Sequence, residues 1–205
     1  HIPSLLTSLN LFAGSAALFL ASEGKGLLIY GAYFILVAAF FDFFEDYLIR
    51  RSQNHTDVGK ELASLADLVS FGVAPAAIMY KLIKVSLKVE AFSLSLPATS
   101  ILLVLSPVMI VMFSAWRLAK FNVDRKKQNN YLGMPTPAFA ILVASLPMIL
   151  SFTGKFLLVS EWNFEFWFIL PIIGLTLAVG NTYFLLAIVL FSVLLVTRFP
   201  MFSFR

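Results

Sequence analysis

The chain contains no cysteine among its 205 residues. This absence excludes disulfide bonds, thiolate metal sites and cysteine nucleophiles. Charged side chains are also scarce at 13% of residues, whereas the hydrophobic set makes up 60%. A soluble domain carries about a quarter charged residues and under half apolar ones. The composition therefore excludes an ordinary soluble globular domain, and its apolar content also excludes a disordered chain.

Acidic residues are fewer than basic ones, and the formal net charge is +4. In a chain this apolar, a basic excess first indicates orientation on a bilayer and not binding to nucleic acid. The connections 50–60 and 117–134 hold more Lys and Arg than the loops expected on the opposite side. The positive-inside tendency therefore predicts that both connections face the cytoplasm.

Long apolar runs occur along the whole chain, and a membrane-spanning helix needs about 20 mostly apolar residues. The last two runs are short and separated only by Gly180 and Asn181, so the runs alone predict six or seven spans. The longest polar connection, 120–133, is too short for a second domain. We therefore expect an all-α, polytopic transmembrane helix bundle in which residues 1–205 form a single membrane domain. The predicted spans are residues 5–21, 27–44, 62–83, 94–119, 138–152, 166–179 and 183–196.

Four carboxylates lie where an apolar environment is expected. Asp42, Glu45 and Asp46 end the second span at spacing i, i+3, i+4, which places them on one helix face. Asp67 lies about one turn into the next helix, and the short connection allows the two acidic faces to meet. A carboxylate at membrane depth costs about 2.5–3.5 kcal/mol. The cluster is therefore either a cap at the water interface or a site bridged by divalent cations, which prefer hard oxygen ligands.

The spacing of these residues also matches a known signature. Asp42, two residues, Glu45, then Arg50, eight residues, Gly59, seven residues and Asp67 follow the order Asp-x2-Asp-Gly-x2-Ala-Arg-x8-Gly-x3-Asp-x3-Asp. The pattern resembles the CDP-alcohol phosphotransferase family. Further blocks resemble its phosphatidylserine synthase branch, and they extend from one end of the chain to the other. These blocks are IPSLLTSLNLF (2–12), GKEL (59–62), SLAD (64–67), VSFGVAPA (69–76), RLAKFNV (117–123), GMPTPA (133–138) and PMFS (200–203).

The resemblance implies a membrane enzyme of six to eight helices that transfers a phosphatidyl group from CDP-diacylglycerol to L-serine and releases CMP. It implies two divalent cations, Mg²⁺ or Mn²⁺, held by a set that here comprises Asp42, Glu45, Asp46 and Asp67. Asp67 would be the catalytic base that deprotonates the serine hydroxyl. The expected surroundings are the lipids of a bacterial or archaeal cytoplasmic membrane, and a homodimer is possible.

The resemblance also assigns residues to the CDP group, namely Thr7, Asn10, Arg50 and Gly59. Each has an alternative that the residues themselves leave open. Thr7 and Asn10, at i and i+3, can instead tie helices together by hydrogen bonds. Arg50 can extend to the membrane interface, as amphipathic side chains do. Gly59 can simply open a helix.

A basic segment follows the fourth span, and the branch motif assigns Arg117, Lys120 and Asn122 to the acceptor or to the lipid phosphate. Arginine binds carboxylates and phosphates through two parallel hydrogen bonds, which suits this role. The alternative for Arg117 and Lys120 is a basic anchor at anionic lipid, which is also our interpretation of residues 125–127. Asn122 can alternatively cap the helix end.

Four signature positions depart from the family pattern. Glu45 replaces an Asp, Asp46 a Gly, Ile49 an Ala, and Ala63 the third Asp, which removes one metal ligand. Asp46 places bulk and negative charge where the diphosphate is expected, although its carboxylate is also a candidate replacement for the ligand missing at Ala63. The sequence thus leaves two functions open. One is a phosphatidylserine synthase with impaired activity, and the other is a pseudoenzyme or engineered fold variant that acts as a membrane scaffold.

Overall fold

The computed structural model describes residues 2–23, 25–52, 57–87, 97–124 and 135–158, together with residues 89, 92 and 93. Every element within these residues is helical, which confirms the all-α class. The predicted spans 166–179 and 183–196, the basic residues 125–127 and the PMFS block lie outside the described residues. The total number of spans therefore stays a prediction, as does the single domain.

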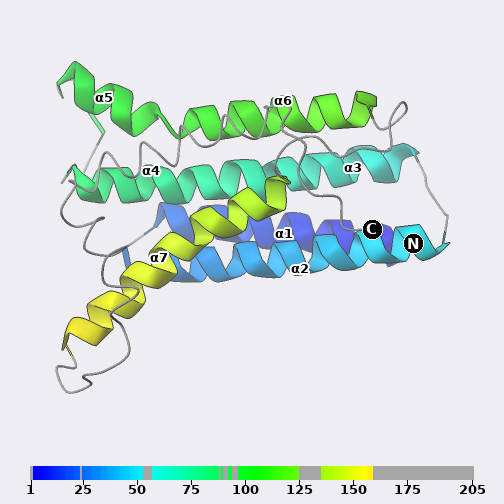
Figure 1. Cartoon of the computed structure of the whole chain (residues 1–205), viewed down its shortest axis with the longest axis horizontal. Helices are drawn as coiled ribbons and strands as arrows, with labels where there is room; N and C mark the ends of the chain where they lie inside the picture. The colour runs from blue at the N-terminus through cyan, green and yellow to red at the C-terminus, as the bar shows by residue number, and fades with distance from the viewer. Residues whose placement is uncertain are drawn as a thin grey trace.

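The helices pack as a layered bundle in which long rods run side by side (Figure 1). One pair is α1 (Ile2–Ser22) and α2 (Leu28–Ser52), joined through the short η1 (Lys25–Leu27). A second rod consists of α3 (Asp57–Leu68), the π-helical η2 (Val69–Val73) and α4 (Ala74–Ser86). A third is formed by α5 (Ala98–Leu105) and α6 (Val108–Asp124), and α7 (Thr136–Leu158) crosses the bundle obliquely (Figure 1).

Four helical segments in the described residues are long and apolar enough to cross a membrane. They correspond to the first four predicted spans, and the apolar part of α7, Thr136–Ile149, is shorter. Large apolar side chains cover the outside of the bundle; Phe12 is 68% exposed and Phe19 is 71% exposed. Such side chains suit contact with lipid acyl chains and not with water. The four segments are Pro3–Ser22, Leu28–Arg51, Val58–Ser86 and Ala98–Asn122.

Two of the long rods are interrupted where the sequence suggested continuous spans. The fourth span breaks between α5 and α6 because Pro107 has no N–H to donate and its ring clashes with the preceding turn. Ser106 Oγ donates to the carbonyl of Leu103 at 2.7 Å in this break. The third span contains the π-helical turn η2, whose Ser70 and Gly72 are buried between neighbouring helices. Such π-turns are frequent next to functional sites, and this one begins two residues after Asp67.

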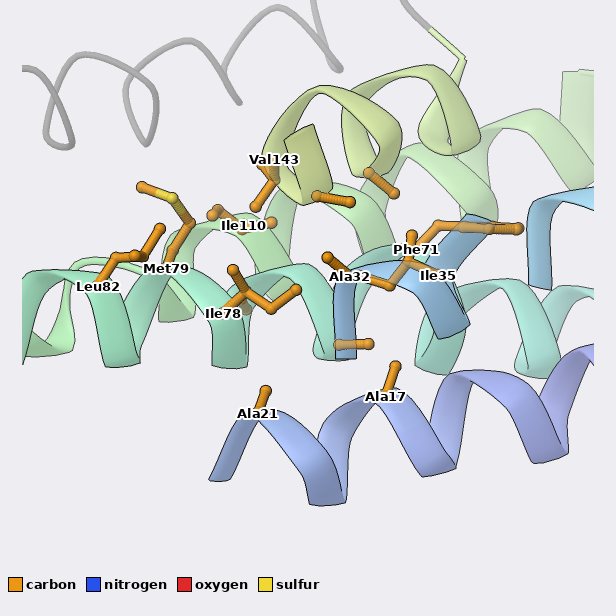
Figure 2. Packing of buried hydrophobic residues seen from close by; sticks show 14 of the residues in the cluster. Ala17, Ala21, Ala32, Ile35, Phe71, Ile78, Met79, Leu82, Ile110 and Val143 are labelled. Carbon is orange, nitrogen blue, oxygen red and sulfur yellow. The ribbon is translucent and has the colours of Figure 1, made fainter. Parts of the chain in front are cut away.

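Small residues allow the helices to approach closely. Ala17 and Ala21 of α1 point towards α2 and α4, and both are fully buried (Figure 2). A Cβ added to Gly31 of α2 would lie 3.0 Å from the carbonyl oxygen of Ala17. Close packing of small residues is the main way in which helices associate in a membrane, where no hydrophobic effect drives them together. Larger side chains fill the centre, where η2, α4, α6 and α7 meet: Phe71, Ile78, Met79, Ile110 and Val143 (Figure 2).

The closest approach, between α1 and η2, gives a test of this packing. A Cβ added to Gly14 would lie 2.1 Å from Ser70 Oγ and 2.6 Å from Ser70 Cα, so the backbone itself must move. We expect Gly14→Ala to lower the free energy of unfolding by about 1–3 kcal/mol, the usual cost of overpacking. The measurement is the thermal unfolding midpoint in detergent micelles. Gly26→Ala is the matched control, because its Cβ meets nothing within 4 Å. Equal effects of the two substitutions would contradict the packing described here.

The ends of the helices that carry the candidate site gather at one end of the bundle. The C-terminal ends of α2 and α6 and the N-terminal ends of α1 and α3 all lie there (Figure 1). At this end Asn122 Nδ2 of α6 donates to Ser64 Oγ of α3 at 3.0 Å. The helices that flank the connections 50–60 and 117–134 therefore meet on one side, as the basic loops suggested. Which side faces the cytoplasm stays a prediction.

Candidate functional site

Two carboxylates from different helices meet at this end. The carboxyl groups of Asp42 from α2 and Asp67 from α3 lie at hydrogen-bonding distance from each other. Two like charges this close are unfavourable unless positive charge or a proton is nearby. The hairpin of α2 and α3 thus creates a position that attracts a cation. Helix α1 packs against both α2 and α3, and α6 packs against α3.

Helix α1 supports this pair through Asn10, which is fully buried. Its Nδ2 donates to Asp67 Oδ1 at 3.1 Å, and its backbone carbonyl accepts a hydrogen bond from Ser70 Oγ at 3.0 Å. Among the described residues, its amide oxygen Oδ1 has no hydrogen-bond partner. Asn10 therefore holds Asp67 in one orientation and keeps one buried oxygen available for a ligand.

The carboxylate of Glu45 does not join this pair but is bonded to α1. Thr7 donates a short hydrogen bond from Oγ1 to Glu45 Oε1, and both side chains are buried. The other oxygen, Oε2, has no partner within the described part of the chain. Glutamate is one methylene longer than the aspartate of the family signature. Glu45 is thus part of a tie between α1 and α2.

The carboxylate of Asp46 lies on the outer side of α2. Its side chain is 55% exposed and forms an ion pair with Arg50 at 3.8 Å. An exposed pair of this kind stabilises a protein by about 1 kcal/mol at most. Ala63 lies partly buried on α3. In this arrangement Asp46 is paired with Arg50 and does not replace the carboxylate missing at Ala63.

The sequence assigns all four carboxylates to metal binding, but their partners differ in the structure. Asp42 lies against Asp67, Glu45 accepts a hydrogen bond from Thr7, and Asp46 is paired with Arg50. Across the described ranges, no three Asp, Glu, His or Cys side chains come close enough together to hold a metal ion. The Asp42–Asp67 pair and the free amide oxygen of Asn10 nevertheless suit one hard cation, since carboxylate and amide oxygens are the ligands that such ions prefer. The residues therefore fit one cation better than two, and metal binding itself stays a prediction.

Helix α6 adds a cationic group beside Asp67. The guanidinium of Arg117 interacts electrostatically with Asp67, and its Nη1 donates to Thr136 Oγ1 of α7 at 3.1 Å. Thr136 is only 2% exposed. Within the described residues the Nε of Arg117 and the buried hydroxyl of Ser114 have no partner. Arg117 thus links the carboxylate pair to α7 and keeps one donor available.

Ser114 and Thr136 are site residues that the sequence analysis missed. Ser114 precedes Arg117 by three residues on the same helix, so the two share a face. It packs against η2, because a Cβ added to Gly72 would lie 3.1 Å from Ser114 Cβ. Thr136 is part of the GMPTPA block, and the family resemblance of this block assigns no role to Thr136. The three-residue spacing from Arg117 could have identified Ser114 from the sequence. No pattern in the neighbouring sequence identifies Thr136.

The structure also locates the other predicted residues. For Thr7 and Asn10 it shows hydrogen bonds between helices, and contact with CDP stays a prediction. Gly59 lies in the first turn of α3, and Arg50 in the last turn of α2. Lys120 follows Arg117 by three residues on α6, whereas Asn122 ties α6 to α3.

Comparison with known proteins assigns the family. Residues 1–193 match the family model described as CDP-alcohol phosphatidyltransferase. The chain belongs to this family. The resemblance drawn from the acidic signature is thereby confirmed. Together with the four long apolar helices, the family indicates an integral membrane protein.

Relatives of this chain include enzymes named for phosphatidylserine or archaetidylserine synthesis. A CDP-diacylglycerol–serine O-phosphatidyltransferase of Bacillus subtilis is 32% identical over 157 residues, which cover 75% of this chain and 76% of that protein. An archaetidylserine synthase of Methanothermobacter thermautotrophicus is 30% identical over 147 residues, covering 70% of this chain and 56% of that protein. A Saccharomyces cerevisiae CDP-diacylglycerol–serine O-phosphatidyltransferase is 33% identical over 160 residues, covering 71% and 53%. The chain thus spans little more than half the length of the latter two.

Proposed function

We propose that this CDP-alcohol phosphatidyltransferase transfers the phosphatidyl group of CDP-diacylglycerol to L-serine, giving phosphatidylserine and CMP. The observation that carries the proposal is the meeting of Asp42, Asp67 and Arg117, from three different helices, at one end of the bundle. The choice of serine as acceptor is supported by the relatives named for that reaction.

Asp67 is the general base of the proposed reaction. It takes the proton from the serine hydroxyl as the hydroxyl oxygen attacks the phosphorus that carries the diacylglycerol. The bond from this phosphorus to the bridging oxygen breaks, and CMP leaves with the electron pair. A base must lie within hydrogen-bond reach of the proton it accepts, and the bond from Asn10 Nδ2 keeps Asp67 in a fixed orientation for this. A divalent cation bound at Asp42 and Asp67 would supply positive charge to the diphosphate oxygens.

The acceptor carboxylate has a matching set of donors on α6. Arg117 Nε and the Ser114 hydroxyl are buried without partners among the described residues. The two residues share a face of α6, and the guanidinium of Arg117 interacts with Asp67. A guanidinium binds a carboxylate strongly and in a defined orientation. Serine bound there by its carboxylate presents its hydroxyl towards Asp67. Lys120, on the same face of α6, suits the lipid phosphate.

The second candidate function is a membrane scaffold without catalysis, and two observations favour it. Ala63 lacks a carboxylate, and Asp46 is paired with Arg50, the residue that the signature directs to the nucleotide. The cation-binding capacity is thus reduced, and the diphosphate path carries an extra negative charge. For the proposed transferase, the same two features predict slow turnover in the unmodified chain.

The test uses the purified full chain in liposomes that contain CDP-diacylglycerol, with Mg²⁺ or Mn²⁺ and radiolabelled serine. The expected result is slow CMP release that requires serine, stops with EDTA and disappears in Asp67→Asn. Glycerol 3-phosphate and inositol are tested in parallel, and release with either in place of serine would overturn the proposed acceptor. No release from the natural chain, together with release from a variant with a restored signature, would favour the scaffold instead.

A further inference from the structure

Helix α1 donates hydrogen bonds to two carboxylates of the site, from Asn10 to Asp67 and from Thr7 to Glu45. We propose that the site takes a single divalent cation between Asp42 and Asp67, that Asn10 Oδ1 is its third protein ligand, and that Thr7 holds Glu45 out of its coordination. This inference deepens the proposed function and rests on it. Its test uses no substrate, so the two can fail separately.

The first support is the amide group of Asn10. Its side chain is 0% exposed, and Nδ2 donates to Asp67 Oδ1 at 3.1 Å. Because Nδ2 and Oδ1 belong to one planar amide, Oδ1 also lies near Asp67. No described residue donates a hydrogen bond to Oδ1. A buried amide oxygen without a partner is destabilising, and a cation held by the adjacent carboxylates would remove that cost.

The second support is the position of the remaining carboxylates. Glu45 is 4% exposed and accepts a hydrogen bond from Thr7, and Asp46 is paired with Arg50 on the outer face of α2. Position 63 carries a methyl group. Mg²⁺ needs about six ligands in near-octahedral geometry and usually keeps several waters. Two carboxylates, one amide oxygen and water are sufficient for one such ion and insufficient for two.

The third support is the balance of charge. Asp42 and Asp67 lie at hydrogen-bonding distance from each other and also interact with the negative charge of Glu45, whereas the cationic side chain of Arg117 interacts with Asp67. Arg117 interacts with Asp67 and also donates one hydrogen bond to Thr136, so its single positive charge does not balance the negative charges around the pair. A bound cation supplies the missing positive charge between the carboxylates.

The experiment measures Mn²⁺ binding to the full chain in lipid nanodiscs, with free Mn²⁺ followed by electron paramagnetic resonance. The expected stoichiometry is one Mn²⁺ per chain, lost in Asp42→Asn and in Asp67→Asn. Asn10→Ala is expected to weaken binding by about 10–100-fold, the usual effect of residues that support a metal site. Glu45→Gln, which still accepts the bond from Thr7, is expected to weaken binding far less than Asn10→Ala, because it removes a nearby negative charge but no ligand. Two Mn²⁺ per natural chain, or loss of binding in Glu45→Gln, would overturn the proposal.

Two further variants separate ligand loss from misfolding. Asn10→Asp keeps an oxygen at the same place and should bind Mn²⁺ at least as tightly as the natural chain, whereas equal weakening in Asn10→Asp and Asn10→Ala would contradict a ligand role. Glu23→Gln, in the exposed segment after α1, is the control and should have no effect. One bound Mn²⁺ without serine-dependent CMP release would support this inference and oppose the proposed function.

Discussion

Replacing Ala63 by Asp and Asp46 by Gly together is expected to raise serine-dependent CMP release about 1000-fold or more. A metal site stabilises a displaced phosphate oxygen by several kcal/mol, and each 1.36 kcal/mol changes the rate by a factor of ten. Ala63 precedes Asp67 by four residues on α3, so a carboxylate at position 63 shares the face that carries Asp67. The first substitution thus returns a ligand to the cation site.

The second substitution acts on the substrate. Asp46 is four residues after Asp42 on α2, next to the expected path of the diphosphate. Its removal takes away a negative charge and releases Arg50 from the 3.8 Å ion pair. Glycine inside a helix costs about 1 kcal/mol of stability relative to alanine, which the long helix α2 can tolerate.

The measurement compares CMP release, with and without serine, for the natural chain, both single variants and the double variant at equal amounts of folded protein. Ala63→Asp alone should help less than the double variant, because Asp46 still repels the diphosphate. Mn²⁺ binding to Ala63→Asp should rise above that of the natural chain. No gain of activity in the double variant would contradict the prediction and move the defect to Glu45 or Ile49.

Arg117→Ala is expected to remove most of the activity of the restored double variant. In the proposed complex Arg117 pairs with the serine carboxylate. Truncating one partner of a buried, hydrogen-bonded charge pair costs about 2–5 kcal/mol, which is a loss of about 30-fold or more. The KM for serine should rise, because Arg117 is the proposed donor to its carboxylate. Arg117→Lys should recover only part of the loss, since an ammonium group keeps the charge without the planar fork.

The control for this prediction is Lys126→Ala, in the basic segment after α6. A residue that only anchors the loop to anionic lipid contributes about 1 kcal/mol to membrane binding and should leave the KM for serine unchanged. Equal effects of Arg117→Ala and Lys126→Ala would return the whole basic segment to membrane anchoring. An unchanged KM with a lower kcat in Arg117→Ala would assign Arg117 to the orientation of Asp67 instead.

Several features of this protein follow from its sequence alone. The scarcity of charge and the long apolar runs are sufficient for an all-helical membrane bundle, because each span must satisfy its own backbone hydrogen bonds in lipid. The first four spans and the family could be predicted from local patterns: apolar length for the spans, and the ordered acidic signature for the family. Both signals lie along the chain and require no knowledge of packing.

The partners of the acidic residues were decided only by the tertiary structure. The spacing i, i+3, i+4 placed Glu45 and Asp46 on one face, yet consecutive helix residues differ by about 100° in direction. Glu45 consequently faces α1 and Asp46 faces outwards, and spacing does not say which side α1 occupies. The Thr7–Glu45 and Asn10–Asp67 bonds join residues 38 and 57 positions apart, so they exist only because α1 packs against α2 and α3. For the same reason the sequence gives no sign of Thr136, which belongs to the site only because the first turn of α7 lies within hydrogen-bond reach of Arg117.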